Sequence, residues 1–299
     1  MRFYSPLRYP GGKNRAIALF KDIIHLNNLQ KCTYVEPFAG GASIALGLLI
    51  EGDVERIIIN DADPSIYSFW ISCLTKNEEF CELLINTKVT VDVWQQQKEI
   101  YQSLREDAIQ GKEYDKMALG FATFFLNRTN RSGIIKGGVI GGHAQTGNYK
   151  IDARFNKQNL EERLKTIAKF ADQVEVHCKD AKQFLLDNCN IWPTNTLIYC
   201  DPPYVQKGHG LYMNYFNKKD HIMLSKTILS LKNKHWVVTY DMDPLIAEIY
   251  KGYLNKKLIL TYSVSHERLV SQSDEYIFFS NGLKIPKSNK LAKLEQIIL

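Results

Sequence analysis

The stretch Tyr34–Ser43 reads Tyr-Val-Glu-Pro-Phe-Ala-Gly-Gly-Ala-Ser, a short strand followed by a turn of small residues and the start of a helix. Gly40 and Gly41 allow the backbone of the turn to approach a ligand closely at the helix N-terminus. The turn lacks the Gly-x-Gly-x-x-Gly spacing of dinucleotide-binding proteins, which argues against a nicotinamide-dependent oxidoreductase. A strand that passes through such a turn into a helix is typical of an α/β fold.

Seven segments rich in β-branched and aromatic residues are predicted to be strands: Cys32–Glu36, Arg56–Asn60, Val174–Cys178, Thr196–Cys200, Trp236–Tyr240, Lys257–Val264 and Glu275–Ser280. The runs Ile57-Ile58-Ile59 and Leu197-Ile198-Tyr199 are apolar throughout, as in strands buried on both faces of a largely parallel sheet. Helical patterns at Ser43–Leu49, Ala181–Asn188 and His221–Leu231 lie between the strands. This alternation predicts an α/β class.

A long helical stretch interrupts the alternation, with patterns at Glu78–Ile85, Val93–Ile109, Tyr114–Leu126 and Asn159–Phe170. We predict a helical domain, residues 66–172, inserted into an α/β domain formed by residues 1–65 and 173–299. Its glycine-rich segment Asn130–Tyr149 is predicted to be a loop or hairpin. Six basic residues and a single acid, Asp152, lie between Gly120 and Lys157. This balance fits either contact with a phosphate backbone or a solvated loop.

Composition narrows the class of protein. The chain has 299 residues, 45% hydrophobic and 23% charged, and carries 38 Lys and Arg against 32 Asp and Glu, for a net charge of +6. These values predict a folded protein with a substantial core that can accept a polyanionic partner. The six cysteines show no Cys-x-x-Cys pair, and the longest nearly apolar run, Ala42–Ile50, is too short to cross a bilayer. We therefore expect a reduced, cytoplasmic protein without a membrane segment or signal peptide.

The tetrapeptide Asp201-Pro202-Pro203-Tyr204 directly follows the predicted strand Thr196–Cys200. Ligands of open α/β sheets bind beyond the carboxyl ends of the strands, so these residues lie where a reacting group would be held. Two prolines remove two N–H donors and leave carbonyl oxygens beside the Asp201 carboxylate. Such an acceptor-rich edge suits an amino group, and Tyr204 offers a face on which a flat base can stack. The structural alternative is a strand-ending turn with a buried tyrosine.

Other acids end strands or begin helices. Asp61 lies about 20 residues beyond the glycines, where nucleoside-binding sheets place a carboxylate for ribose hydroxyls. Its alternative role is to cap the helix that follows, for which Asp63 is equally suited. Asp180 either accepts a hydrogen bond from the adenine amino group of a cofactor or caps Ala181–Asn188.

Taken in order, these motifs resemble those of Dam-type (D12 class, alpha group) adenine-specific DNA methyltransferases. The resemblance rests on Arg8-Tyr9-Pro10-Gly11-Gly12-Lys13, Glu36-Pro37-Phe38-Ala39-Gly40-Gly41, Asp61, Asp201–Tyr204, Phe124–Thr129, Gly210-Leu211-Tyr212 and Glu275–Asn281. It covers nearly the whole chain. It implies a Rossmann-like methyltransferase sheet of about seven strands, with the insert as a target-recognition domain.

The resemblance also implies a cofactor, S-adenosylmethionine, and places its contacts. The matching positions are Tyr9, Lys13, Glu36, Pro37, Phe38, Gly40, Asp61 at the ribose, Asp180 near the adenine, and Asp201 beside the methionine moiety. Catalysis is assigned to Asp201, Pro202, Pro203 and Tyr204. No metal is required. Three basic residues of the insert are considered as DNA contacts: Arg128, Arg131 and Lys136. Three lysines that follow the tetrapeptide either line the groove that would hold the DNA or are ordinary surface lysines: Lys207, Lys218 and Lys219.

The implied reaction moves a methyl group to the N6 amine of an adenine flipped out of double-stranded DNA. N4-cytosine DNA methylation, RNA adenine methylation and an inactive nucleic-acid-binding relative are the alternatives. A cognate restriction endonuclease would be a partner in function without a stable complex, and the reaction would take place in the cytoplasm of a bacterium or a phage-infected host. The basic tail Lys284–Lys293 is predicted to be solvated.

Overall fold

The computed structural model describes residues 3–8, 13–205, 216–263, 270–289 and 292–297. In chain order the elements are η1 (Asn14–Ala16), α1 (Ile17–Leu26), β1 (Cys32–Glu36), α2 (Ser43–Ile50), β2 (Val54–Asn60), α3 (Pro64–Thr75), α4 (Asn77–Asn86), α5 (Val91–Ile109), α6 (Lys116–Thr129), η2 (Arg131–Gly133), η3 (Ile151–Arg154), α7 (Lys157–Ala168), η4 (Ala171–Gln173), β3 (Val174–His177), α8 (Ala181–Asn188), β4 (Leu197–Cys200), α10 (Lys218–Leu229), β5 (His235–Asp241), α11 (Pro244–Ile249), β6 (Leu254–Ser263), β7 (Val270–Phe279) and β8 (Ala292–Glu295).

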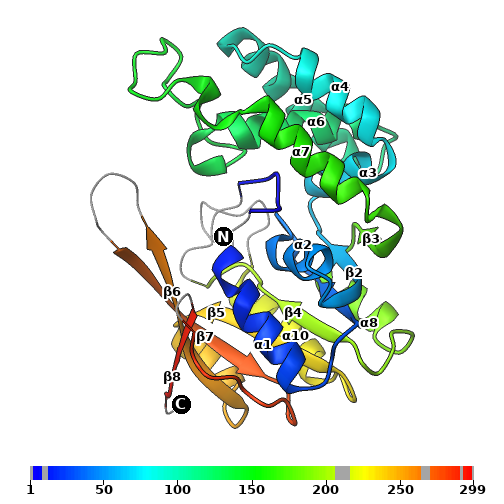
Figure 1. Ribbon diagram of the computed structural model, residues 1–299, viewed down its shortest axis with the longest axis vertical. Coiled ribbons are helices and arrows are strands. Elements are labelled where there is room, and N and C mark those ends of the chain that lie inside the picture. The colour runs from blue at the N-terminus through cyan, green and yellow to red at the C-terminus, as the bar shows by residue number, and fades with distance from the viewer. Residues whose placement is uncertain (1–2, 9–12, 206–215, 264–269, 290–291, 298–299) are drawn as a thin grey trace. The chain divides into compact units, whose positions relative to one another are not determined.

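The chain divides into two compact units (Figure 1). The helical unit comprises Met1–Gly12 and Asp61–Cys178, and the sheet unit comprises Lys13–Asn60 and Lys179–Leu299. Within the described residues, no helix is both long and apolar enough to cross a membrane.

The strands are ordered β3-β2-β1-β4-β5-β7-β6-β8. Strand β1 runs parallel to both β2 and β4, and β4 runs parallel to β5. The predicted α/β class is confirmed, and so are the seven predicted strands, with shifts at their ends that reach five residues at the start of β7. The three C-terminal strands are antiparallel to their neighbours, and β8 makes an eighth strand, paired with β6. The prediction of a solvated tail at Lys284–Lys293 was therefore wrong at its end, because Ala292 is fully buried against β6.

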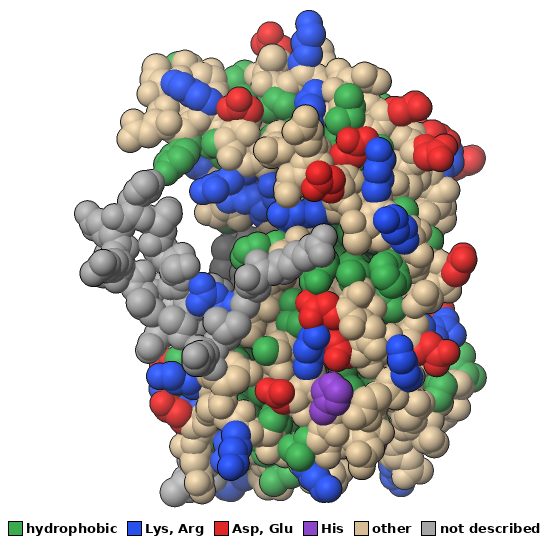
Figure 2. Space-filling model, viewed as in Figure 1, with side chains coloured by type: hydrophobic (Ala, Val, Ile, Leu, Met, Phe, Trp, Pro, Cys, Tyr) green, Lys and Arg blue, Asp and Glu red, His purple; other side chains and the backbone are tan. Residues whose placement is uncertain are grey.

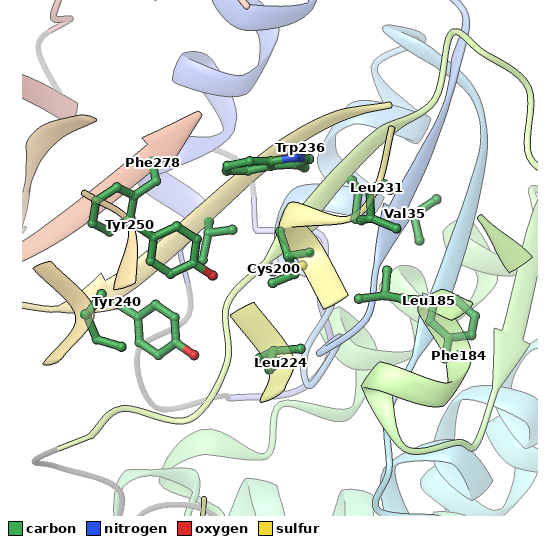
Figure 3. Packing of buried hydrophobic residues seen from close by; sticks show 14 of the residues in the cluster. Val35, Phe184, Leu185, Cys200, Leu224, Leu231, Trp236, Tyr240, Tyr250 and Phe278 are labelled. Atoms are coloured by element: carbon green, nitrogen blue, oxygen red, sulfur yellow. The ribbon is translucent and has the colours of Figure 1, made fainter. Parts of the chain in front are cut away.

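One face of the sheet holds a large hydrophobic core. It is built from β1, β4, β5 and β7 together with α8, α10 and α11, and Figure 3 shows Val35, Cys200, Leu224, Tyr250 and Phe278 packed in it. Tyr250 stacks on Phe278 with ring centroids 4.6 Å apart. Because side chains alternate along a strand, the residues between these core positions point to the other face.

The opposite face is covered by helix α1. Phe20 of α1 packs edge-on against Tyr34 and Tyr199, with centroids 6.0 and 4.6 Å away. On this same face lie Thr239, which alternates with the core residues Val238 and Tyr240, and Glu275. The face that α1 covers thus receives polar side chains at the carboxyl ends of β4 and β5 and near the middle of β7.

The helical unit is held together by aromatic residues of α3, α4 and α6. Phe69, Phe80 and Phe124 lie with ring centroids 5.6 to 5.9 Å apart. Gly120 lets α6 approach α3, because a Cβ atom there would lie 2.5 Å from the Ser68 carbonyl oxygen. The four predicted helices of the insert are confirmed, and the preceding α3 is an additional one.

The N-terminal residues pack within the helical unit, whereas the predicted division assigned all of residues 1–65 to the α/β domain. The Asn127 side chain accepts a hydrogen bond from the Arg8 backbone N–H at 2.7 Å and donates one to the Arg8 carbonyl at 2.9 Å. Arg163 also donates to the Ser5 carbonyl at 3.0 Å. The residues that these bonds join lie more than 115 positions apart in the sequence, so no local sequence pattern indicates the bonds.

Candidate active site

The tetrapeptide Asp201–Tyr204 follows β4 directly, as predicted. Pro202 and Pro203 are buried, while Tyr204 is half-buried and the Asp201 side chain keeps 26% of its surface exposed. The chain beyond Tyr204 is anchored by Val205, whose backbone N–H donates to the Asp241 carboxylate at 3.0 Å. The edge of the sheet therefore holds one accessible carboxylate beside an aromatic ring.

Lys13 is the centre of the site. Its side chain is 2% exposed, and its Nζ donates hydrogen bonds to Asp201 Oδ1, to the Tyr204 hydroxyl at 3.1 Å and to Thr239 Oγ1 at 3.1 Å. Glu275 Oε2 lies 3.0 Å from the same nitrogen as an ion pair. The three protons of the ammonium group are thus used by three acceptors, with a second carboxylate alongside.

A second layer of hydrogen bonds fixes these groups. Thr239 donates to Asp201 Oδ1 at 2.8 Å, and the Tyr199 hydroxyl lies 2.8 Å from Thr239 Oγ1. The Tyr204 hydroxyl donates to Glu275 Oε1 at 2.6 Å. Among the described residues, every hydrogen bond to the Asp201 carboxylate reaches Oδ1. Oδ2 of Asp201 is therefore the oxygen that can accept from a bound ligand.

The electrostatics follow from burial and pairing. Burial alone would lower the pKa of Lys13, but the negative charges of Asp201 and Glu275 outweigh it and raise the pKa well above its usual value. Burial raises the pKa of Glu275, and the nearby Asp201 charge adds to this, while Lys13 opposes it. With both acids ionised, the group of Lys13, Asp201 and Glu275 carries one net negative charge.

The turn after β1 forms another part of the sheet unit. Glu36 ends β1, is buried, and accepts the Ala45 backbone N–H of α2 at 3.0 Å. Burial raises the pKa of Glu36 to about 8. Gly40 and Ala42 have φ values of +46° and +45°, so the turn is left-handed at a glycine, which adopts this conformation freely, and at an alanine, for which it is strained.

Through its side chain, Asn60 connects the turn after β1 with the segment at Lys179 that leads into α8. Its side chain donates to the Pro37 and Lys179 carbonyls, each at 3.0 Å, and accepts the Lys179 N–H at 3.0 Å. Its own carbonyl accepts from Ala39 at 2.9 Å. The structure thereby places Pro37 and Phe38 beside the residues that precede Asp180.

The acids after β2 and β3 have clear local roles. Asp180 is the N-cap of α8, where it accepts the Lys182 and Gln183 N–H groups at 3.1 and 3.2 Å. Asp63, rather than Asp61, caps α3, and its carboxylate also pairs with Arg105 at 3.1 Å. Asp61 is half-buried in the helical unit, where it accepts the Asp63 N–H at 2.9 Å. Tyr9 lies outside the described residues, as do Lys207 and Gly210–Tyr212.

The DNA-contact candidates in the helical unit differ in exposure. Arg131 and Lys136 are exposed on the glycine-rich loop. Arg128 is half-buried, and its Nε donates to the Arg154 carbonyl at 2.8 Å. Burial and the charges of Arg8, Arg163 and Arg154 lower the pKa of Arg128 to about 9.

On the face drawn in Figure 2, basic and acidic side chains are mixed, and several Lys and Arg side chains lie next to one another near its middle. None of the four crowded arginines Arg8, Arg128, Arg154 and Arg163 has a carboxylate within salt-bridge distance among the described residues. By contrast, Arg105 of the same unit is paired with Asp63. The crowded group therefore leaves positive charge unneutralised.

Sequence reasoning missed three contributors to the site. Thr239 and Glu275 belong to strands that carry no separate motif for them, and Asn60 reads as an ordinary strand end. Glu275 begins one of the segments on which the family resemblance rests, but that resemblance assigned it no role. Only the pairing of β7 with β5, in which Glu275 lies opposite Asp241, brings it to the site.

The amino-acid sequence is similar to those of known proteins. The family model for D12 class N6 adenine-specific DNA methyltransferases matches residues 9–264. The type II methyltransferase M.MjaIII of Methanocaldococcus jannaschii is 25% identical over 85% of this chain and 90% of its own. The retron Ec67 DNA adenine methylase of Escherichia coli is 21% identical over 84% and 83%, and M.CviBI of Paramecium bursaria Chlorella virus NC1A is 24% identical over 83% and 87%. The chain belongs to the D12 class of N6 adenine-specific DNA methyltransferases.

Proposed function

We propose that the sheet unit transfers a methyl group from S-adenosylmethionine to the N6 amine of an adenine flipped out of double-stranded DNA, with Asp201 and Tyr204 in contact with the target base. The observation that carries this proposal is the buried network in which Lys13 and Thr239 hold Asp201 Oδ1 and leave Oδ2 as an acceptor. The exocyclic amine is a poor nucleophile because its lone pair is delocalised into the ring. An acceptor for its hydrogens is therefore what the reaction needs.

Asp201 Oδ2 and the Pro202 carbonyl accept the two amino hydrogens in this proposal. These bonds orient the lone pair toward the methyl group, and positioning of this kind supplies a large part of the rate. The net negative charge of the Lys13, Asp201 and Glu275 group stabilises the positive charge that develops on the nitrogen. Flipping costs a few kcal/mol, part of which stacking on Tyr204 recovers at about 1–3 kcal/mol.

The described residues fit S-adenosylmethionine, which supplies an electrophilic methyl group on a positively charged sulfur. The left-handed turn at Gly40 allows close backbone approach, and the buried Glu36 provides a carboxyl group beside it. Asn60 holds this turn and the Asp180 segment together. We place the cofactor along Glu36–Gly40, with Lys13 and Asp201 at its reactive end. Asp180 at the adenine, Asp61 at the ribose and Tyr9 complete the proposed set.

The helical unit is proposed to bind and read the DNA. Its exposed Arg131 and Lys136 and the unneutralised group around Arg128 provide charge for phosphates. A restriction endonuclease that cuts the same site is the proposed partner in function, and the reaction is placed in the cytoplasm of a bacterium or phage-infected cell.

The test is to express the protein in a host without adenine methylation and to read the genomic DNA by modification-sensitive single-molecule sequencing. We expect N6-methyladenine in one short recurring context. Methylcytosine in such a context would move the assignment to N4-cytosine, and unmodified DNA together with methylated RNA would move it to RNA.

Two single substitutions test the roles proposed for Asp201 and Tyr204. Asp201→Ala should nearly abolish methyl transfer, and Tyr204→Ala should weaken catalysis more than cofactor binding, measured by radiolabelled transfer and by calorimetry. Wild-type activity in either variant would refute its assignment.

A further inference from the structure

Glu275 is a buried carboxylate of β7 that touches two of the proposed active-site residues. Its side chain is 4% exposed, Oε1 accepts the Tyr204 hydroxyl at 2.6 Å, and Oε2 lies 3.0 Å from Lys13 Nζ. No local structural need explains it, because its neighbours Tyr276 and Phe278 already anchor β7 in the core on the other face. A buried charge is retained only where it is paired or where it serves a function.

The charge balance of the site shows what Glu275 contributes. Lys13 contacts Asp201 directly, and one cation beside one carboxylate would leave the pair neutral. Methyl transfer places positive charge on the amine, so a neutral pair would stabilise it poorly. A second carboxylate restores one negative charge.

We propose that Glu275 is a positioning residue for methyl transfer. It pairs with the Lys13 ammonium together with Asp201, so that the Asp201 charge is not fully neutralised and can stabilise the target amine. It also fixes the Tyr204 ring by accepting a hydrogen bond from the hydroxyl. This inference rests on the proposed function and assigns a residue to it.

The titratable groups around Lys13 come from several elements. They are Asp201 and Tyr204 after β4, Tyr199 on β4 and Glu275 on β7, with the hydroxyl of Thr239 on β5. Burial raises the pKa of Tyr199 well above 10, so it stays neutral between pH 7 and 9. Glu36 acts on Asp201 and has a pKa of about 8. Glu36 is present both in wild type and in the Glu275→Gln variant described below. Its titration therefore affects the pH dependence of kcat in the same way in both proteins.

The decisive variant is Glu275→Gln, which keeps an acceptor for Tyr204 but removes the charge. We expect kcat to fall about ten- to hundredfold at pH 7.5, while the affinity for S-adenosylmethionine changes little. Because Asp201 remains beside Lys13 and keeps its pKa raised, the ammonium stays protonated and kcat should stay below that of wild type from pH 7 to 9. Glu275→Asp, which keeps the charge, should retain more of the wild-type kcat than Glu275→Gln, which a merely structural role would not produce.

A double variant tests the same charge balance. Lys13→Met with Glu275→Gln again leaves Asp201 as one unpaired negative charge. It should be more active than the product of the two single effects predicts. Glu51→Gln, which removes a glutamate from a surface pair with Lys21 in the same unit, is the matched control and should behave as wild type.

A measurement without substrate separates this inference from the proposed function. In protein labelled with 13C at the lysine Cε, with the Lys13 signal assigned by its loss in Lys13→Met, Lys13 should titrate at lower pH in Glu275→Gln than in wild type. An unchanged titration, or a variant with wild-type kcat and pH profile, would overturn the inference. If wild type methylates no nucleic acid, the proposed function fails, and the Lys13 titration still decides the role of Glu275. Should Glu275→Gln not fold, Glu275→Asp keeps the charge, and an Lys13 titration like that of the control supports the inference.

Discussion

Thr239 donates a hydrogen bond of 2.8 Å to Oδ1 of Asp201 while accepting one from Lys13 at 3.1 Å. The hydroxyl thus fixes which oxygen of Asp201 is occupied by the protein and which is left for a ligand. This relationship joins two neighbouring parallel strands at their carboxyl ends, where a substrate of an α/β sheet binds.

Replacing Thr239 by Val should lower kcat about tenfold or more, because a hydrogen bond to a charged group is lost and only Lys13 then fixes the orientation of Asp201. Binding of S-adenosylmethionine, measured by calorimetry, should change little. The matched control is Thr123→Val, a fully buried threonine whose hydroxyl, among the residues described, bonds only to the Leu119 carbonyl of its own helix. Equal losses of kcat in both variants would show that the effect is one of stability.

Glu36→Gln should stabilise the unliganded protein at alkaline pH. The pKa of Glu36 rises from 4.5 to about 8 on folding, so its contribution to stability is fully present below pH 4.5 and is lost as the pH rises through 8. The variant removes this loss. Its melting temperature should exceed that of wild type at pH 9, and the difference should shrink toward pH 5. A constant difference across this range would contradict the buried state of the carboxyl group.

Arg131→Gln and Arg128→Gln should have different effects. Arg131 is exposed, so its loss should weaken DNA binding, lower the salt slope of log K by about one and leave the melting temperature unchanged. Arg128 binds the Arg154 and Pro6 carbonyls, so its loss should also destabilise the helical unit. Lys165→Gln removes a surface charge paired with Glu161 and serves as the control. The measurements are fluorescence anisotropy with labelled DNA at several salt concentrations and thermal melting.

Gly133→Ala should destabilise the protein by roughly 1–3 kcal/mol or more. Gly133 has a φ of +76°, and a Cβ atom there would lie 2.1 Å from the Arg8 carbonyl oxygen. Gly138 of the same loop has no atom of the described residues within 4 Å of an added Cβ and no positive φ, so Gly138→Ala should melt like wild type. Similar melting temperatures for the two variants would show that residues 5–8 do not depend on Gly133.

The central strands were predictable from sequence because burial on both faces makes them largely apolar. β4 is apolar throughout, β1 and β5 are buried along nearly their whole length, and the predicted limits of all three differ from the observed ones by at most one residue. β6 and β7 begin earlier than predicted, at Leu254 and Val270, because polar residues follow these first positions and interrupt the apolar pattern. The short β8 is stabilised only by pairing with β6, which no local pattern reveals.

The site was predictable only in part, for the same reason. Asp201 and Tyr204 form a local motif with its own chemistry, and the family resemblance drew attention to Lys13. The contacts that unite them are distant in sequence: Lys13 and Asp201 are 188 positions apart, and Lys13 and Thr239 are 226 apart. Sequence spacing cannot show that one ammonium serves two carboxylates from different strands.

The hydrogen bonds between Asn60 and Lys179 have a consequence for how such enzymes diversify. The chain leaves the sheet unit after Asn60 and re-enters it at Lys179, and these two residues are held together by side-chain bonds at 3.0 Å. Both ends of the intervening segment are therefore attached to one fixed point. Recombination at this pair would exchange the intervening segment as one piece, because the sheet unit already holds its two ends together.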